Sequence, residues 1–173
     1  MNHNVMFETR HLKIIPMTLE DSEQFRKLRN RDDNRKWFIY KEIITKEEQE
    51  KWFQKYLEQE NDYMFAVYSN KAEANFLGAA SIYDIDLQQK KAEIGRIIID
   101  RQEVAGKGYG LEVVKGLIDI SFHLLKLEKI YAKIYEDNDA SLKTFQRAGL
   151  RIIEKKTGKN GETIVYLEKN QMD

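Results

Sequence analysis

The sequence predicts an α+β fold, in which a mixed, mainly antiparallel central sheet of about seven strands is flanked by about four helices. Apolar runs of strand length occur along the chain between segments whose apolar residues recur at helical spacing. Two or three strands follow one another without a helix at two places, so the sheet is expected to be mixed rather than all-parallel.

In the first half of the chain, capping signals mark both helices. Thr18 stands before an acidic first turn, and Thr45 opens the capping-box pattern that ends at Glu48. The polar segment 69–74 suits a hairpin between two apolar runs. The predicted elements are a strand at 7–17, a helix after Thr18, a helix from Thr45, and strands at 63–68 and 75–83.

In the second half, glycine marks the element ends. Gly149 is a typical helix stop, and Asn160-Gly161 is a strong signal for a tight turn between two strands. The predicted elements are a strand at 92–99, a helix at 109–125, a strand at 130–135, a helix from Asp137 to Ala148, and strands at 150–156 and 163–168.

Composition narrows the class of protein. The 173 residues suit one domain, and 29 basic residues balance 29 acidic ones, which gives no reason to expect nucleic acid or a membrane surface as a partner. The chain has no cysteine, and its three histidines do not show metal-ligand spacing, so no metal is expected. Without a signal-peptide pattern or a long apolar run, we expect a cytoplasmic location.

The most informative segment is Ala105-Gly106-Lys107-Gly108-Tyr109-Gly110, between the strand at 92–99 and the helix that follows. Glycine at every second position allows a tight turn and leaves amide groups uncovered. The start of a helix adds free N–H groups and a partial positive charge. The segment therefore predicts a phosphate cradle and a phosphate-bearing cofactor.

This element order resembles the GNAT N-acetyltransferase superfamily, whose acetyl-CoA motif Gln/Arg-x-x-Gly-x-Gly/Ala falls on residues 105–110, with Ala105 at the Gln/Arg position. A second family motif resembles the segment 138–150, where Asn138, Ser141 and Gly149 agree and Phe145 replaces a tyrosine. The chain is most similar to the ribosomal-protein N-acetyltransferase branch. Its segment 28–53 has a looser similarity to the amino-sugar N-acetyltransferase of the pseudaminic acid pathway.

The resemblance implies that residues 1–173 form one acetyl-CoA-dependent N-acetyltransferase domain, with acetyl-CoA as co-substrate. The sheet would be split where the pantetheine arm inserts along the strand before the glycine turn, and an N–H near Ile98 would polarise the thioester carbonyl. The implied cofactor-binding residues are Ile97, Ile98, Ile99, Ala105, Gly106, Lys107, Gly108, Tyr109, Gly110, Asn138, Ser141 and Phe145.

Glu93 is the candidate general base, because a carboxylate on an apolar strand takes up a proton more readily than one in water. A structural carboxylate paired with Arg96 or with a nearby lysine is an equal alternative. Phe145 cannot donate a proton to the leaving thiolate. Another hydroxyl could serve, either Tyr109, which joins Glu93 and Ile98 as a candidate catalytic residue, or Tyr135 or Ser141, or the thiolate could leave unprotonated.

The acceptor is expected to be a small primary amine, with a nucleotide-linked amino sugar favoured. In the resembled family the region that holds Trp37, Phe38 and Tyr40 walls the acceptor pocket, and Tyr83 is added to this candidate substrate set. The alternatives are a protein N-terminal acetyltransferase and an acyl-CoA-binding module without catalysis. A monomer or a homodimer is expected.

Overall fold

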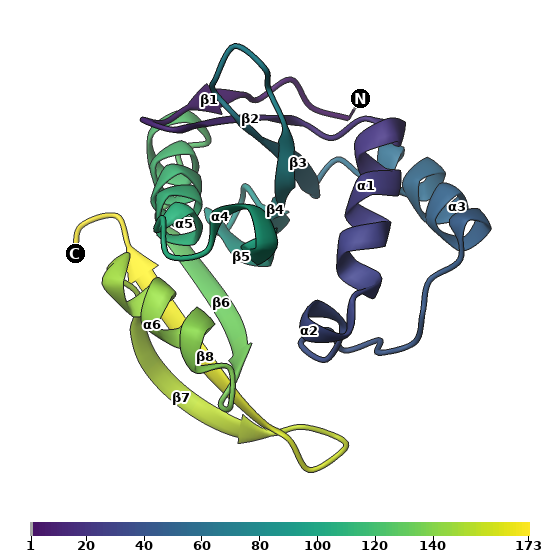
Figure 1. Cartoon of the computed structure of the whole chain (residues 1–173). Helices are drawn as coiled ribbons and strands as arrows, with labels where there is room; N and C mark the ends of the chain where they lie inside the picture. Colours follow the sequence, from purple (N-terminus) through teal and green to yellow (C-terminus); the bar gives the residue numbers. More distant parts are fainter. Residues whose placement is uncertain (1) are drawn as a thin grey trace. The chain divides into compact units, whose positions relative to one another are not determined.

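The computed structural model describes residues 2–173, which contain one mixed sheet of eight strands in the order β1-β2-β3-β4-β5-β6-β8-β7 (Figure 1). The α+β class is confirmed, with one strand more than predicted. The strands are β1 Phe7–Glu8, β2 Leu12–Pro16, β3 Tyr63–Ser69, β4 Phe76–Asp86, β5 Lys91–Ile99, β6 Lys129–Tyr135, β7 Arg151–Thr157 and β8 Thr163–Asn170. The helices are α1 Leu19–Asn30, α2 Asp32–Arg35, α3 Lys46–Leu57, α4 Arg101–Val104, α5 Tyr109–Asp119, the π-helix η1 Ile120–Leu124, and α6 Asp139–Arg147.

Two of the predicted elements differ from the structure. The single strand expected at 7–17 is two antiparallel strands, β1 and β2, because Thr9 closes a turn by hydrogen bonds between its amide and Leu12 O (2.9 Å) and between Leu12 N and its own hydroxyl (3.1 Å). The helix expected at 109–125 changes to a π-helix at Ile120, where Leu125 N donates to Ile120 O at 3.0 Å. The short helices α2 and α4 lack a repeat of apolar residues that would have predicted them.

The predicted helix starts are confirmed. Thr18 and Thr45 each accept a hydrogen bond from the backbone three residues on, and Asp21 and Glu48 complete the two capping boxes. The Asn138 side chain accepts from Ser141 N at 3.3 Å and caps α6. Local sequence therefore sets where these three helices begin.

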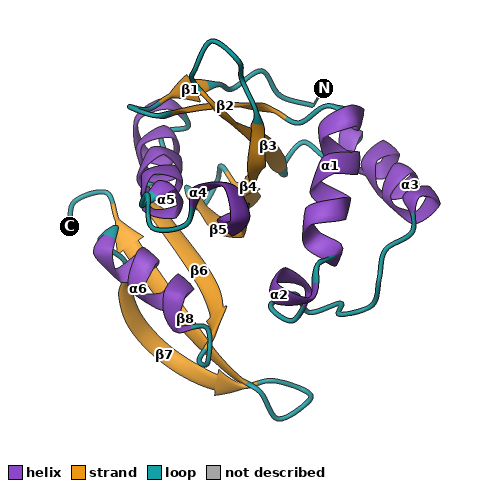
Figure 2. Ribbon diagram, in the orientation of Figure 1, coloured by secondary structure: helices purple, strands orange, loops and turns teal. Residues whose placement is uncertain are grey.

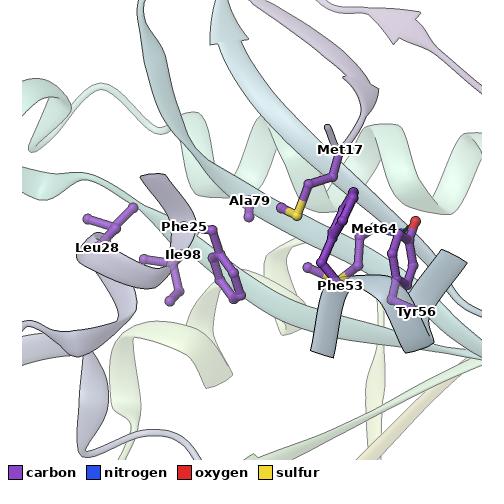
Figure 3. Close-up of a cluster of buried hydrophobic side chains, with 8 residues drawn as sticks. All are labelled: Met17, Phe25, Leu28, Phe53, Tyr56, Met64, Ala79 and Ile98. Carbon is purple, nitrogen blue, oxygen red and sulfur yellow. Dashed lines mark hydrogen bonds between the residues drawn. The ribbon is translucent and has the colours of Figure 1, made fainter. Parts of the chain in front are cut away.

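The chain divides into two compact units, which are described separately. The first comprises residues 1–81 and 96–109, and α1 and α3 lie next to each other in it (Figure 2). Its core joins side chains of both helices to side chains of the strands and of the β2–α1 junction (Figure 3). The core residues are Met17, Phe25, Leu28, Phe53, Tyr56, Met64, Ala79 and Ile98.

The second unit comprises residues 82–95 and 110–173. In it, β6 pairs with β8 and β8 with β7, both antiparallel, and Ala132 lies opposite Leu167 in the buried part of the β6–β8 pair (Figure 1). The first residues of β5 pair with β6 in parallel, and this register contains Lys91–Glu93 opposite Lys129–Tyr131. No helix within residues 2–173 is long and apolar enough to cross a membrane. That residues 1–173 act as one functional domain stays a prediction.

Candidate active site

The glycine turn has the backbone conformation that its sequence predicts. Gly106 and Gly108 have φ angles of +76° and +74°, and a Cβ atom at either position would point into open space. The amides of Ala105 and Lys107 donate to Arg101 O (3.0 Å) and Val104 O (3.2 Å). Within residues 2–173, the backbone amides of Gly106 and Gly108 have no hydrogen-bond partner. Two uncovered N–H groups thus lie directly before α5, as an anion site requires.

The segment between β5 and this turn is fixed by a short helix and an ion pair, neither of which was predicted from the sequence. Asp100 caps α4 by accepting from Gln102 N at 3.0 Å, and its Oδ1 also accepts from Arg31 Nη1 at 2.8 Å. Its amide donates to Leu77 O at 2.7 Å. Asp100 therefore ties the segment before the glycine turn to β4 and to the end of α1.

The last residues of β5 have a fixed backbone on the side that faces β4. Gly78 makes this close approach possible, because a Cβ at its position would lie 1.9 Å from Ile98 O. The Ile98 side chain is buried in the core of the first unit. The role predicted here, polarisation of the thioester carbonyl, therefore belongs to a backbone N–H. Ile97–Ile99 lie beyond the three residue pairs that β5 forms with β6. That this part of β5 binds a strand-like ligand, as sheet edges do, stays a prediction.

Glu93 lies in the second unit with only 5% of its side chain exposed, and two donors hold its carboxylate. Tyr83 donates its hydroxyl to Oε1 at 2.6 Å, and Lys133 Nζ lies 3.0 Å from Oε2. The predicted alternative of a lysine partner is therefore present, whereas Arg96 pairs with Asp62 at 2.8 Å in the first unit. Lys133 was missed because it follows Glu93 by 40 residues, and only the pairing of β5 with β6 brings the two side chains together.

Charges around Glu93 alter the titration of its neighbours. Burial lowers the pKa of Lys133, but the hydrogen bond and negative charge of Glu93 outweigh it and raise that pKa above its usual value. The pKa of Tyr131, which lies opposite Glu93 in the sheet, is raised by burial and then by the charges of Glu93, Asp84 and Asp86. The charge of Lys133, whose Nζ lies 5.6 Å from the Tyr131 ring centre, lowers that pKa, so burial is the main cause of the raised value.

Comparisons with known proteins place the chain in a family. Residues 11–151 match the acetyltransferase (GNAT) domain. The chain belongs to the GNAT acetyltransferase family. A Bacillus subtilis spermine/spermidine N(1)-acetyltransferase is 31% identical over 86 residues, which are 50% of this chain and 55% of that enzyme, so the chain spans about half the length of this curated relative.

Two solved structures show the GNAT fold over nearly the whole chain. Spermidine N-acetyltransferase from Vibrio cholerae, in complex with CoA and spermine, has a TM-score of 0.83 at 20% identity and covers 95% of this chain and 98% of that chain. Another structure of that enzyme is dodecameric. Ribosomal-protein-S5-alanine acetyltransferase from Vibrio fischeri has a TM-score of 0.82 at 22% identity and covers 98% of both chains.

The residues of the second GNAT motif lie on α6 in the second unit. Asn138 and Ser141 form the helix cap, and the Phe145 side chain is buried with 4% exposure. Among the hydroxyls considered as leaving-group acids, Tyr109 is buried with its ring stacked on His11 at 5.4 Å. Burial, together with the charges of Glu162 and Asp137, raises the pKa of Tyr135, and Ser141 is half-buried.

The aromatic side chains of the predicted acceptor region have different surroundings in the first unit. Phe38 packs against the core, Trp37 is half-buried with Lys36 Nζ 4.8 Å from its ring centre, and Tyr40 is 54% exposed. Tyr83, which belongs to the same predicted set, lies in the second unit and contacts Glu93. Phe38 thus lies at the edge of the core, and Tyr40 is the most accessible of the three aromatic residues between α2 and α3.

Proposed function

We propose that this chain transfers an acetyl group from acetyl-CoA to a primary amine. One observation carries the proposal: the GNAT match includes a turn in which the amides of Gly106 and Gly108 are uncovered and directly precede α5. That arrangement suits the pyrophosphate of CoA. The edge of β5 at Ile97–Ile99 suits the pantetheine arm, and the amide at Ile98 is the proposed donor to the thioester oxygen.

In the proposed reaction, the amine nitrogen bonds to the carbonyl carbon of the thioester and the carbon–sulfur bond breaks. CoA leaves as the thiolate, and the amine nitrogen loses a proton. Glu93 is the proposed acceptor of that proton. Tyr109, Tyr135 and Ser141 remain alternatives for protonating the thiolate, which can also leave unprotonated because thiols have pKa values of about 8.5.

Replacement of Glu93 tests whether this carboxylate is the general base. Loss of a general base lowers turnover by roughly 10²- to 10⁴-fold. Glu93→Gln should lower kcat on that scale, most strongly at low pH, and leave the KM for acetyl-CoA unchanged. If the role of Glu93 is purely structural, the Glu93→Gln variant should instead keep the wild-type kcat at every pH and have a lower melting temperature.

For the acceptor, we propose a small aliphatic polyamine. The named activity of the Bacillus relative supports this class. The nucleotide-linked amino sugar that the sequence favours gains no support from the comparisons. A protein N-terminus is the second candidate, since the structural neighbour from Vibrio fischeri is named for that activity.

Two measurements, carried out one after the other, test the proposed function. Calorimetry with CoA and acetyl-CoA should show binding by the purified chain, and absence of heat with both would remove the phosphate-cradle assignment. A thiol-release assay should then compare spermidine, spermine, a nucleotide-linked amino sugar and a peptide with an N-terminal alanine. Turnover fastest with the polyamines supports the proposed acceptor. Binding of CoA without release by any amine would favour an acyl-CoA-binding module.

A further inference from the structure

The segment between α2 and α3 exposes an apolar surface. Residues 36–45 contain neither helix nor strand, yet three of their apolar side chains face solvent. The exposed fractions are 89% for Ile39, 54% for Tyr40 and 62% for Ile43. Segments without secondary structure need other partners for their backbone groups if they are to keep one conformation.

Arg29 on α1 supplies such partners from inside the first unit. It is 4% exposed, and its guanidinium donates to the carbonyl oxygens of Tyr40 and Glu42, the latter at 3.1 Å. The same group lies 4.8 Å from the ring centre of Phe38 and 5.8 Å from that of Tyr40. Within residues 2–173, Arg29 has no carboxylate in ion-pair distance, and burial lowers its pKa. A buried cation without an anion is costly, so these carbonyl contacts are its compensation.

Neighbouring side chains on the same face of α1 hold the far end of the segment. Asn30 accepts from Ile44 N at 2.9 Å and donates to Ile44 O at 2.8 Å. Arg26 Nη1 donates to the same oxygen at 2.9 Å. Residues 26, 29 and 30 are spaced i, i+3 and i+4, so one helix face fixes three carbonyls of the segment 36–44.

We propose that Arg29 is a positioning residue for the acceptor. It keeps the backbone of residues 36–44 in one conformation, which fixes the direction of the exposed Tyr40 side chain toward the amine substrate. The inference rests on the proposed function and on the prediction from the sequence that Tyr40 contacts the acceptor. The planar guanidinium is suited to this task because it can donate to two carbonyls at once, whereas an ammonium group acts as a single point of charge.

The test compares Arg29→Lys and Arg29→Gln with the wild-type chain. Hydrogen exchange of residues 36–44 should become faster in both variants, while exchange of β3 stays unchanged. Because small displacements of substrate-positioning groups can cost up to ~10²-fold in rate, we expect a rise of roughly tenfold in the KM for spermidine. The KM for acetyl-CoA should stay as in the wild type, and kcat should stay within about twofold.

Two further variants keep the test decisive. Arg10→Lys changes an exposed arginine in the β1–β2 turn and should alter none of these readouts. Asn30→Ala removes both hydrogen bonds to Ile44 and the 3.5 Å contact of its Oδ1 with Arg29 Nη1, but it keeps the Arg29 side chain. It should therefore show the same pattern if the Arg29 variants do not fold.

Unchanged exchange of residues 36–44 in the Arg29 and Asn30 variants would overturn the positioning role. Faster exchange with an unchanged acceptor KM would also overturn it, since the segment would then be held for a reason other than the acceptor. If the wild-type chain binds no CoA and transfers no acetyl group, the proposed function fails, and the exchange comparison still decides whether Arg29 holds the segment.

Discussion

The Tyr83 hydroxyl donates a hydrogen bond to the Glu93 carboxylate directly beside Gly95. The bond from Tyr83 Oη to Glu93 Oε1 measures 2.6 Å. Gly95 lies two residues after Glu93 on the same face of β5, and a Cβ at Gly95 would stand 3.2 Å from the Tyr83 hydroxyl. An alanine at position 95 would therefore require the Tyr83 side chain to shift by a few tenths of an ångström.

Gly95→Ala should lower kcat because the added methyl pushes the Tyr83 ring away from Glu93. Tyr83→Phe, which keeps the ring and removes the hydroxyl, should lower kcat in the same direction, and the double variant should be no slower than the worse single one. Steady-state kinetics with saturating acetyl-CoA measures this. Additive losses in the double variant would show that Gly95 acts by another route.

Substitution of Gly108, compared with substitution of Gly161, should distinguish a loss of CoA binding from an effect of backbone strain. Gly108 and Gly161 both have positive φ and open space around the Cβ position, so alanine at either costs about 1–2 kcal/mol of strain. Gly108→Asp adds a carboxylate to the proposed phosphate site, and we expect CoA affinity to fall by at least about tenfold, or about 1.4 kcal/mol.

Gly161→Asp, in the turn between β7 and β8, is the matched control and should leave CoA affinity unchanged. Calorimetric titration of both variants provides the comparison. Equal affinity of the Gly108 variant and the wild type would remove the cradle from this turn.

The cap of α6 offers a similar comparison. Asn138→Ala and Thr18→Ala each remove a side-chain cap and should each lower the free energy of unfolding by about 1 kcal/mol. If Asn138 also binds the cofactor, as the family motif implies, only Asn138→Ala should raise the KM for acetyl-CoA. Chemical denaturation and kinetics on the same samples distinguish a cap from a cap that also binds.

His3 should make stability depend on pH. Its side chain is 8% exposed, stacks on Tyr63 at 4.4 Å, and lies 3.0 Å from Met64 O. Burial lowers its pKa below 6.5, although the hydrogen bond to Met64 acts in the opposite direction. The unfolded chain therefore binds a proton below pH 6.5 that the folded chain does not, and the stability contributed by neutral His3 is lost as pH falls.

Urea denaturation at pH 7.5 and pH 5.5 measures this loss, which has an upper limit of about 1.4 kcal/mol per pH unit. His3→Gln should be less sensitive to the change of pH than the wild type, whereas His123→Gln at an exposed position should behave like the wild type. Equal sensitivity of all three proteins would assign the pH dependence to other groups.

Local sequence was sufficient wherever one segment of the chain decides its own structure. The capping boxes at Thr18 and Thr45, the stop at Gly149 and the left-handed turn at Gly106 and Gly108 follow from short-range hydrogen bonding and backbone sterics. The two family motifs have the same local character, which explains why the α+β class and the GNAT family were predicted without coordinates.

Contacts between distant segments required the folded structure. Lys133 meets Glu93 because β6 lies beside β5, Arg31 reaches Asp100 from the end of α1, and Arg29 holds carbonyls more than ten residues ahead. None of these pairs has a spacing that sequence periodicity can reveal, since each depends on strand order and helix packing. The sequence by itself determined the turn that suits a phosphate, while the tertiary structure decided which charges surround the candidate base and what holds the segment 36–44.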